Sequence, residues 1–218
     1  FTSHIHLLDE LSVKQLAGEH MSTGKVAISQ GESTPEHTGV YAQLANDRNP
    51  LAIVEGRGGA AVQGERVSQL AGMVSSQGRS PLIISPTAKA KTYLQKDAGI
   101  TAPVAQRTAL TGDMALNGLS TVIVQQAETL GLKQSLLLLE QANATGAQVI
   151  FMDSGQSKGT GYALGVLEAE GVKRNQFNDA PRPTVEIETA TDKRHTWTAS
   201  PVVKIPAYRL LVRKNSHN

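Results

Sequence analysis

The sequence LAIVEGRGGAAVQGER, at residues 51–66, contains a short apolar run, a cluster of glycines and the start of an amphipathic segment. This order is typical of a strand, a phosphate-binding loop and a helix, for which the consensus is G-x-x-x-x-G-K-[ST]. Aligned on Gly56, the consensus requires Gly, then Lys, then Ser or Thr, where the chain has Ala61, Val62 and Gln63. The stretch therefore predicts the shape of a phosphate loop without its lysine and its hydroxyl.

The missing side chains are the ones that phosphoryl transfer needs. The lysine offsets the charge of the phosphates, and the hydroxyl holds Mg²⁺. Valine and glutamine do neither, so we expect no ATP hydrolysis and no nucleotide-binding residues here. Backbone N–H groups at a helix N-terminus still attract anions, and the alternative is a tight turn without a ligand. The degenerate loop consists of Gly56, Arg57, Gly58, Gly59, Ala61, Val62 and Gln63.

Short apolar runs alternate with segments of helical periodicity from residue 51 onward. This rhythm predicts an α/β fold with a mostly parallel β-sheet that is covered by helices on both faces. Ligands of such sheets bind at the carboxyl ends of the strands, where all the motifs discussed here fall. We expect strands at 51–54, 82–84, 122–124 and 148–152, and helices at 62–77 (with Gly78 as its C-cap), 88–97, 132–145 and 162–170.

The regions before and after this core predict a chain of three parts. Residues 1–50 form an N-terminal helical segment, with helices at 5–20 and 40–46, and residues 51–175 form the α/β domain. In the first helix Leu8, Leu11, Leu16 and Ala17 have the spacing of one buried face.

Residues 176–218 make up the third part. Residues 175–183 are predicted to form a linker or turn, and 185–189 and 202–212 are predicted to add strands or an ordered tail. From residue 171 to the end there are nine Lys or Arg against four Asp or Glu. We therefore expect a basic tail that leads to a following domain.

The composition excludes several kinds of site. The 218 residues include no cysteine, which excludes disulfides and thiolate metal sites. The net charge is only +2, so any contact with nucleic acid is expected to be local. His4 and His6 share a face only on a strand, and we expect no metal and no cofactor. No apolar run approaches the ~20 residues of a membrane span, and no membrane insertion is expected.

Four short segments together resemble a known family. They are GRGGAAVQ at 56–63, ISPTAKA at 84–90, VIVQQ at 122–126 and MDSGQ at 152–156. In this order they are similar to the phosphate loop, motif Ia, the acidic motif after a strand and motif III of RecD-like, superfamily-one helicases. Within that group the chain resembles the TraI-type conjugative relaxase–helicases, and more closely their vestigial helicase copy than the working motor.

The resemblance implies a degenerate RecA-like domain without catalytic residues. Gln125 and Gln126 stand where an active helicase has Asp-Glu, and an amide is neither a strong Mg²⁺ ligand nor a base near neutral pH. Motif Ia contacts single-stranded DNA in the family. The DNA-binding residues implied are Pro86, Thr87, Lys89 and Lys91, together with Gln156 and Lys158 of the glycine-rich turn at 155–161.

Each of these assignments has a structural alternative. The lysines can be a solvated helix face, and the turn at 155–161 can be a plain tight turn. Tyr93 is the best candidate for stacking on a base, against partial packing in the core. Asp153 is more simply a turn cap than a general base.

Three functions remain open from the sequence. The first is a catalytically inactive helicase-like domain that binds single-stranded DNA during plasmid transfer. The second is an interaction module with a translocation signal, recognised by the coupling protein of a type IV secretion system. The third, an active ATP-dependent helicase lobe, is disfavoured by Val62, Gln125 and Gln126. The resemblance also implies contacts with neighbouring domains of the same relaxase in bacteria and transfer of the parent protein to the recipient cell. A cytoplasmic location is expected, because no signal peptide and no membrane span is recognised in the sequence.

Overall fold

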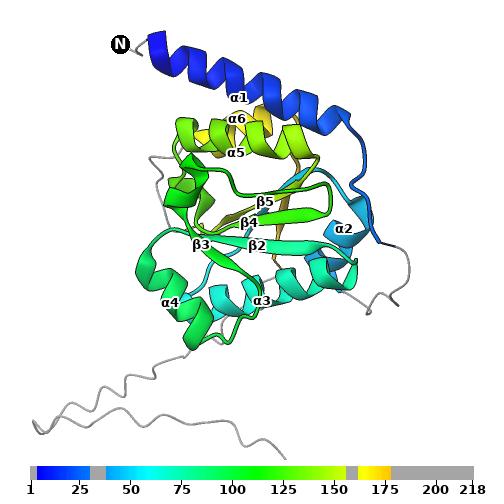
Figure 1. Cartoon of the computed structure of the whole chain (residues 1–218), viewed down its shortest axis with the longest axis vertical. Coiled ribbons are helices and arrows are strands. Elements are labelled where there is room, and N and C mark those ends of the chain that lie inside the picture. The colour runs from blue at the N-terminus through cyan, green and yellow to red at the C-terminus, as the bar shows by residue number, and fades with distance from the viewer. Residues whose placement is uncertain (1–3, 30–37, 156–161, 178–218) are drawn as a thin grey trace, which may run out of the picture. The chain divides into compact units, whose positions relative to one another are not determined.

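The structure is a computed structural model that describes residues 4–29, 38–155 and 162–177 (Figure 1). All of these residues belong to one compact unit, Phe1–Ala180. The predicted strands at 185–189 and 202–212 and the basic tail lie outside the described residues. The division of the chain into three parts stays a prediction.

A six-stranded, wholly parallel sheet forms the centre of this unit. The strand order is β3-β2-β4-β5-β1-β6, which confirms the predicted α/β class. The strands are β1 (Leu51–Glu55), β2 (Ser80–Ser85), β3 (Val104–Gln106), β4 (Ser120–Val124), β5 (Gln148–Asp153) and β6 (Arg174–Gln176).

The two edge strands, β3 and β6, were not predicted from the sequence. The polar strand β6, Arg-Asn-Gln, begins just before and runs into the stretch that the sequence indicates as a linker. It is held to β1 by main-chain hydrogen bonds, with Phe177 N donating to Glu55 O at 2.8 Å. A strand of three polar residues cannot be predicted from a pattern of apolar residues, because its pairing depends on the backbone alone.

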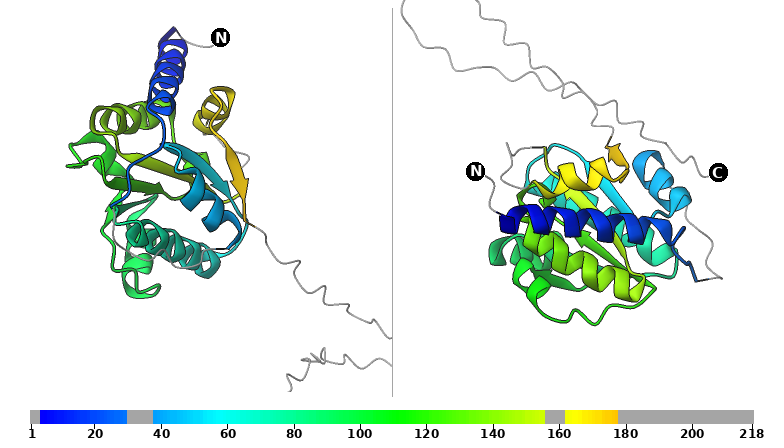
Figure 2. Two further views of the ribbon diagram at one scale, coloured as in Figure 1. Left: turned by 90° about the vertical axis from the view of Figure 1, so that its right-hand side faces the viewer. Right: turned by 90° about the horizontal axis from the view of Figure 1, so that it is seen from above.

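Helices cover both faces of the sheet (Figure 2). One face carries α1 (His4–Ser22), α5 (Leu132–Thr145) and α6 (Ala163–Ala169), and the other carries α2 (Gly39–Asp47), α3 (Ala60–Ser76) and α4 (Ala88–Lys96). Because successive side chains of a strand point to opposite faces, Leu51, Ile53, Val149 and Phe151 join the first layer. Ala52, Val54, Ile150 and Met152 join the second. Two short 3₁₀ helices, η1 (Arg107–Thr111) and η2 (Ala127–Thr129), complete the described elements.

Single residues at the helix termini form capping interactions, among them the predicted cap at Gly78. Gly78 follows α3 with a φ of 68°, its N–H donates to Ser75 O at 2.9 Å, and the N–H of Arg79 donates to Val74 O at 3.2 Å. This is the pattern of a Schellman C-cap, which needs a left-handed residue at this point. At the start of α4, Thr87 Oγ1 accepts a hydrogen bond from Ala90 N at 3.1 Å.

The first helix is where predicted, but its buried face is not. The sequence favours Leu8 and Leu11 as core residues, yet their exposed fractions are 63% and 54%. Val13, Ala17 and His20, in the second half of α1, are the residues that pack against the sheet layer. The first half of α1 projects beyond the helices beneath it (Figure 2). Helical spacing identifies a face, but the extent of the neighbouring helices decides which part of it is covered.

His4 and His6 lie on this helix and not on a strand. Residues two apart on a helix do not face the same way. Among the described residues there is no group of three or more side chains that could hold a metal ion. Nor does any helix in this part of the chain have the length and apolar character that crossing a membrane requires.

Candidate nucleic-acid interface

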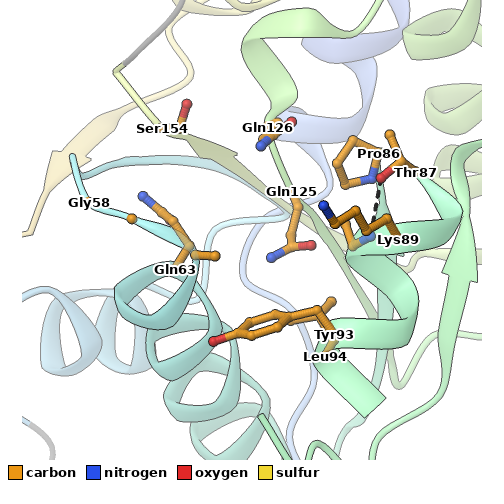
Figure 3. Close-up of a pocket in the computed structure, with 13 residues that line it drawn as sticks. Gly58, Gln63, Pro86, Thr87, Lys89, Tyr93, Leu94, Gln125, Gln126 and Ser154 are labelled. Atoms are coloured by element: carbon orange, nitrogen blue, oxygen red, sulfur yellow. Dashed lines mark hydrogen bonds between the residues drawn. The ribbon is translucent and has the colours of Figure 1, made fainter. Parts of the chain in front are cut away.

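A cleft of about 340 Å³ lies at the carboxyl edge of the sheet (Figure 3). It brings together residues from four segments that are far apart in sequence. They are Gly58, Gly59, Ala60 and Gln63 after β1, Pro86, Thr87, Lys89, Ala90, Tyr93 and Leu94 after β2, Gln125 and Gln126 after β4, and Ser154 after β5. Each of the four segments that carry the family resemblance contributes to this cleft.

The start of helix α4 forms one wall of the cleft. Thr87 is the N-cap, so its hydroxyl oxygen accepts from Ala90 N while its own O–H proton is available for donation. Lys89 follows in the first turn and is exposed. A helix N-terminus carries a partial positive charge, and here a lysine adds a full one. The wall therefore suits an anionic group.

The glycine loop after β1 is occupied by side chains of the protein itself. Gln63 Nε2 donates to Gly56 O at 2.6 Å, and Arg66 Nη1 donates to Arg57 O at 3.0 Å. The Arg66 guanidinium also lies 4.6 Å from the centre of the Phe177 ring. A Cβ atom on Gly56 would lie 2.6 Å from Arg66 Nη1 and 2.6 Å from the Phe177 ring. The absence of a side chain at Gly56 thus accommodates Arg66 and Phe177.

Val62 packs where a phosphate loop has its lysine. A Cβ atom on Gly58 would lie 2.7 Å from Val62 Cγ1, so the valine side chain rests on the loop backbone. Val62 is 42% exposed and brings no charge. The loop keeps its shape and its glycines, but its lysine position provides packing in place of electrostatics.

Arg107 holds the end of β4 in place. Nothing in the sequence indicated this role. Its guanidinium donates to Gln125 O at 3.2 Å and Gln126 O at 3.0 Å, and to Thr129 Oγ1 at 2.8 Å. Burial lowers the pKa of Arg107, and the nearby Glu128 carboxylate opposes this shift. Gln126 adopts a left-handed conformation with a φ of 48°. The two glutamines are therefore held in place through their main-chain oxygens.

The end of β5 is held by a separate ion-pair network. Arg174 of β6 contacts Asp153 Oδ2 at 2.6 Å and Glu55 Oε2 at 3.0 Å, and it also pairs with Glu168. The hydrogen bond to Glu168, followed by that to Asp153, raises the pKa of Arg174 against the effect of burial. The other oxygen of Asp153 accepts from Gly155 N at 2.8 Å. Asp153 is thus a turn cap and an ion-pair partner.

Ser154, which follows Asp153, is also tied to the fold. Its hydroxyl and its N–H both donate to the buried carboxylate of Glu128, the latter at 3.1 Å. This contact joins the end of β5 to η2. Ser154 also lines the cleft.

Of the DNA-binding residues predicted from the sequence, Pro86, Thr87 and Lys89 line the cleft, whereas Lys91, on the same helix, does not. Gln156 and Lys158 lie outside the described residues. Contact with DNA stays a prediction for all six. Of the degenerate loop, Gly58, Gly59 and Gln63 line the cleft and the other members lie beside it.

Tyr93 packs partly in the core and also borders the cleft, and its stacking on a base stays a prediction. Its ring is half-buried, packs against the second core layer and lies 3.1 Å from a Cβ built on Gly64. It also lines the cleft. The side chains that sequence reasoning missed, Arg66, Arg107 and Arg174, lie in no motif, and the partners of Arg107 and Arg174 are mostly distant in the chain.

The chain is similar to known proteins over most of its length. Residues 56–153 match the family described as the TraI helicase-associated ssDNA-binding domain, N-terminal. Two relatives, each named multifunctional conjugation protein TraI, come from Escherichia coli, one of them from strain K12. Each is 38% identical over 197 residues, which is 88% of this chain and 11% of the relative. The chain thus spans about a tenth of the length of these relatives. The chain therefore belongs to the TraI conjugation-protein family, and its residues 56–153 belong to the N-terminal helicase-associated ssDNA-binding domain of that family.

Proposed function

We propose that this domain binds single-stranded DNA during conjugative transfer and carries out no phosphoryl transfer. The observation that supports it is the composition of the cleft at the carboxyl edge of the sheet. Thr87 and Lys89 offer a hydroxyl, a cation and a helix N-terminus, while the positions of the catalytic lysine and carboxylates are Val62, Gln125 and Gln126. The site keeps what attracts phosphate and lacks what activates it.

The missing groups act together in catalysis. A metal ion must bridge the phosphates, a lysine must offset their charge and a carboxylate must position water or metal. In this cleft Gln63 is bonded to the loop and Val62 packs on Gly58. Neither provides a Mg²⁺ ligand or a cation, so ATP turnover is not expected.

The charge of the chain sets the expected strength of DNA binding. A net charge of +2 gives no broad electrostatic attraction. Binding should depend on a few local phosphate contacts, each of which contributes about −0.7 to the slope of log K against log salt for a single strand. The domain is therefore expected to bind moderately, with little sequence preference and clear salt sensitivity.

The test is a fluorescence-anisotropy titration of a labelled single-stranded oligonucleotide at several salt concentrations. Lys89→Ala should weaken binding and lower the salt slope by about 0.7, the contribution of one phosphate contact. Lys25→Ala is the matched control, because Lys25 is exposed but lies near Asn46, before β1, at the amino edge of the sheet. No binding by the wild-type domain at low salt would refute the proposal. DNA-stimulated release of phosphate from ATP would refute the statement that the domain carries out no phosphoryl transfer.

A second candidate function is favoured by the first half of α1. Ile5, Leu7, Leu8 and Leu11 are between 51% and 71% exposed. Leu8 lies three residues from both Ile5 and Leu11, and Leu7 lies four residues from Leu11, so these side chains form neighbouring pairs on the helix surface. An exposed apolar patch of this kind is typical of a protein-binding surface. This supports an interaction module that docks on the type IV coupling protein.

Capture of the purified coupling protein tests this second function. The double variant Leu8→Ser, Leu11→Ser should lose capture, and Gln15→Ser, an exposed polar position on α1, should keep it. Absence of capture by the wild-type domain at micromolar concentrations would count against the interaction module.

A further inference from the structure

The side-chain oxygen of Gln125 is a buried hydrogen-bond acceptor to which no described group donates. The residue is only 9% exposed, and its Oε1 atom is buried with no hydrogen-bond partner among the described residues. Figure 3 shows its side chain pointing into the cleft, among Gln63, Lys89 and Tyr93. A buried polar atom without a partner is costly, and the cleft is the place from which a partner can come.

The main chain of Gln125 explains why the side chain stays in this position. Arg107 binds the carbonyl oxygens of Gln125 and Gln126, and Gln125 N donates to Ile84 O at 2.9 Å. The backbone at the end of β4 is therefore fixed between two neighbours. Gln125 is placed in advance at the centre of the cleft, as a binding group has to be.

The lining of the cleft near this amide combines apolar side chains with one cation. Pro86, Ala90, Tyr93 and Leu94 are the apolar residues, and Lys89 lies at the start of the same helix. The volume of about 340 Å³ falls within the range of small-molecule sites. An aromatic ring next to an amide and a lysine matches the parts of one nucleotide, namely a base face, a base edge and a phosphate.

We propose that the cleft holds one unpaired nucleobase of the bound strand, with the Gln125 amide on its Watson–Crick edge. This inference rests on the proposed single-stranded DNA binding. Each of the four bases carries an N–H donor beside an acceptor on that edge. An amide has one acceptor and a pair of donors, and it can turn over to match either order. Gln125 therefore selects for an unpaired base of any identity.

A base pocket of this kind distinguishes single strands from duplex. In a duplex the Watson–Crick edges are bonded to each other and cannot reach Gln125. Gln125 then has a new use at the position where an active helicase has a metal-binding carboxylate. The cleft that has lost its phosphate chemistry becomes a pocket for a base.

A double-mutant cycle tests the pairing of Gln125 with a base. The probes are a labelled oligothymidylate of about twelve nucleotides, within the usual length of such sites, and an abasic strand with the same number of phosphates. Gln125→Leu should weaken binding of the thymidylate strand about 5- to 10-fold, the value of one or two hydrogen bonds. Binding of the abasic strand should change less than about 2-fold, because its phosphate contacts are the same.

The stability of the free protein separates this role from a structural one. Leucine at position 125 removes the unpaired acceptor, so the variant should unfold at the same or a higher temperature than the wild type. A structural glutamine would give the opposite result. Gln69→Leu, at an exposed position of α3, is the control and should leave both affinities unchanged.

The possible outcomes differ in what they overturn. Equal effects of Gln125→Leu on the two strands, or no effect on the thymidylate strand, would overturn the base pocket and leave DNA binding intact. Absence of binding of either strand to the wild type would overturn both. A 5- to 10-fold loss confined to the strand with bases supports the pocket.

Discussion

Replacing Gly56 by alanine tests why the phosphate-like loop contains glycine. A Cβ atom at this position would lie 2.6 Å from both Arg66 Nη1 and the Phe177 ring, and 2.8 Å from Arg66 Cζ. Real Cβ contacts are not this short, so these two side chains have to move. Arg66 is only 7% exposed, donates to Arg57 O and stacks on Phe177, so it cannot move without losing contacts.

The size of the effect follows from that crowding. Inserting a methyl group into a packed site costs about 1–3 kcal/mol in the free energy of unfolding. For a unit of this size each kcal/mol corresponds to about 2–4 °C, which predicts that the melting temperature falls by about 2–12 °C. The same substitution in an Arg66→Ala background should cost less, because the guanidinium is no longer there.

Gly72→Ala is the matched control. Gly72 lies inside α3 on its exposed side, and apart from its chain neighbours and the helix backbone no described atom lies within 4 Å of a Cβ built there. Alanine is favoured over glycine within a helix by about 1 kcal/mol, so this variant should melt a few degrees higher. The assay is thermal unfolding followed by circular dichroism. If Gly56→Ala is as stable as the wild type, the loop is not held by Arg66 and Phe177, and the packing explanation is wrong.

Two further predictions concern ionised groups. Arg174→Met should lower the free energy of unfolding by about 1–3 kcal/mol, because it leaves two carboxylates, Glu55 on β1 and its register partner Asp153 on β5, without their shared cation. Urea unfolding measures this change. Adding Asp153→Asn to the variant should recover part of the lost stability. Burial lowers the pKa of His20, whose Nε2–H donates to Ala147 O at 2.8 Å, so the neutral form is favoured in the fold. The contribution of His20 to stability is present above the unfolded pKa of about 6.5 and is lost as the pH falls below it. Between about pH 7.5 and about pH 5 the melting temperature should therefore fall less for His20→Gln than for the wild type. Equal decreases in melting temperature would contradict this account.

The position of the cleft could be predicted from the sequence, because the segments that follow parallel strands meet at one edge of the sheet. The segments after 51–54, 82–84, 122–124 and 148–152 all follow apolar strands, and parallel strands present their carboxyl ends at one edge. The cleft contains Gln63, Thr87, Gln125 and Ser154, one from each of these segments. Motif order and strand direction together were enough to place them near one another.

The sequence did not indicate which side chains face the cleft. Lys89 lines it and Lys91 does not, although both follow the same motif. The orientation of each lysine depends on how α4 rotates against the sheet, and that is set by Leu94 and Tyr93 packing into the second core layer. Arg107 had no detectable signal, because its partners Gln125, Gln126 and Thr129 lie about twenty residues away.

The sequence by itself determined the alternation of strands and helices, the parallel sheet and the loss of the charged groups of phosphoryl transfer. These properties are carried by local periodicity and by residue identity. Only the tertiary structure decided that Leu8 and Leu11 are exposed and that Gly56 makes room for Arg66. It also decided that the side-chain oxygen of Gln125 is buried with no hydrogen-bond partner in the described part of the chain. Exposure and hydrogen-bond pairing depend on what distant segments place beside a residue, and a single stretch of sequence contains no record of its neighbours in space.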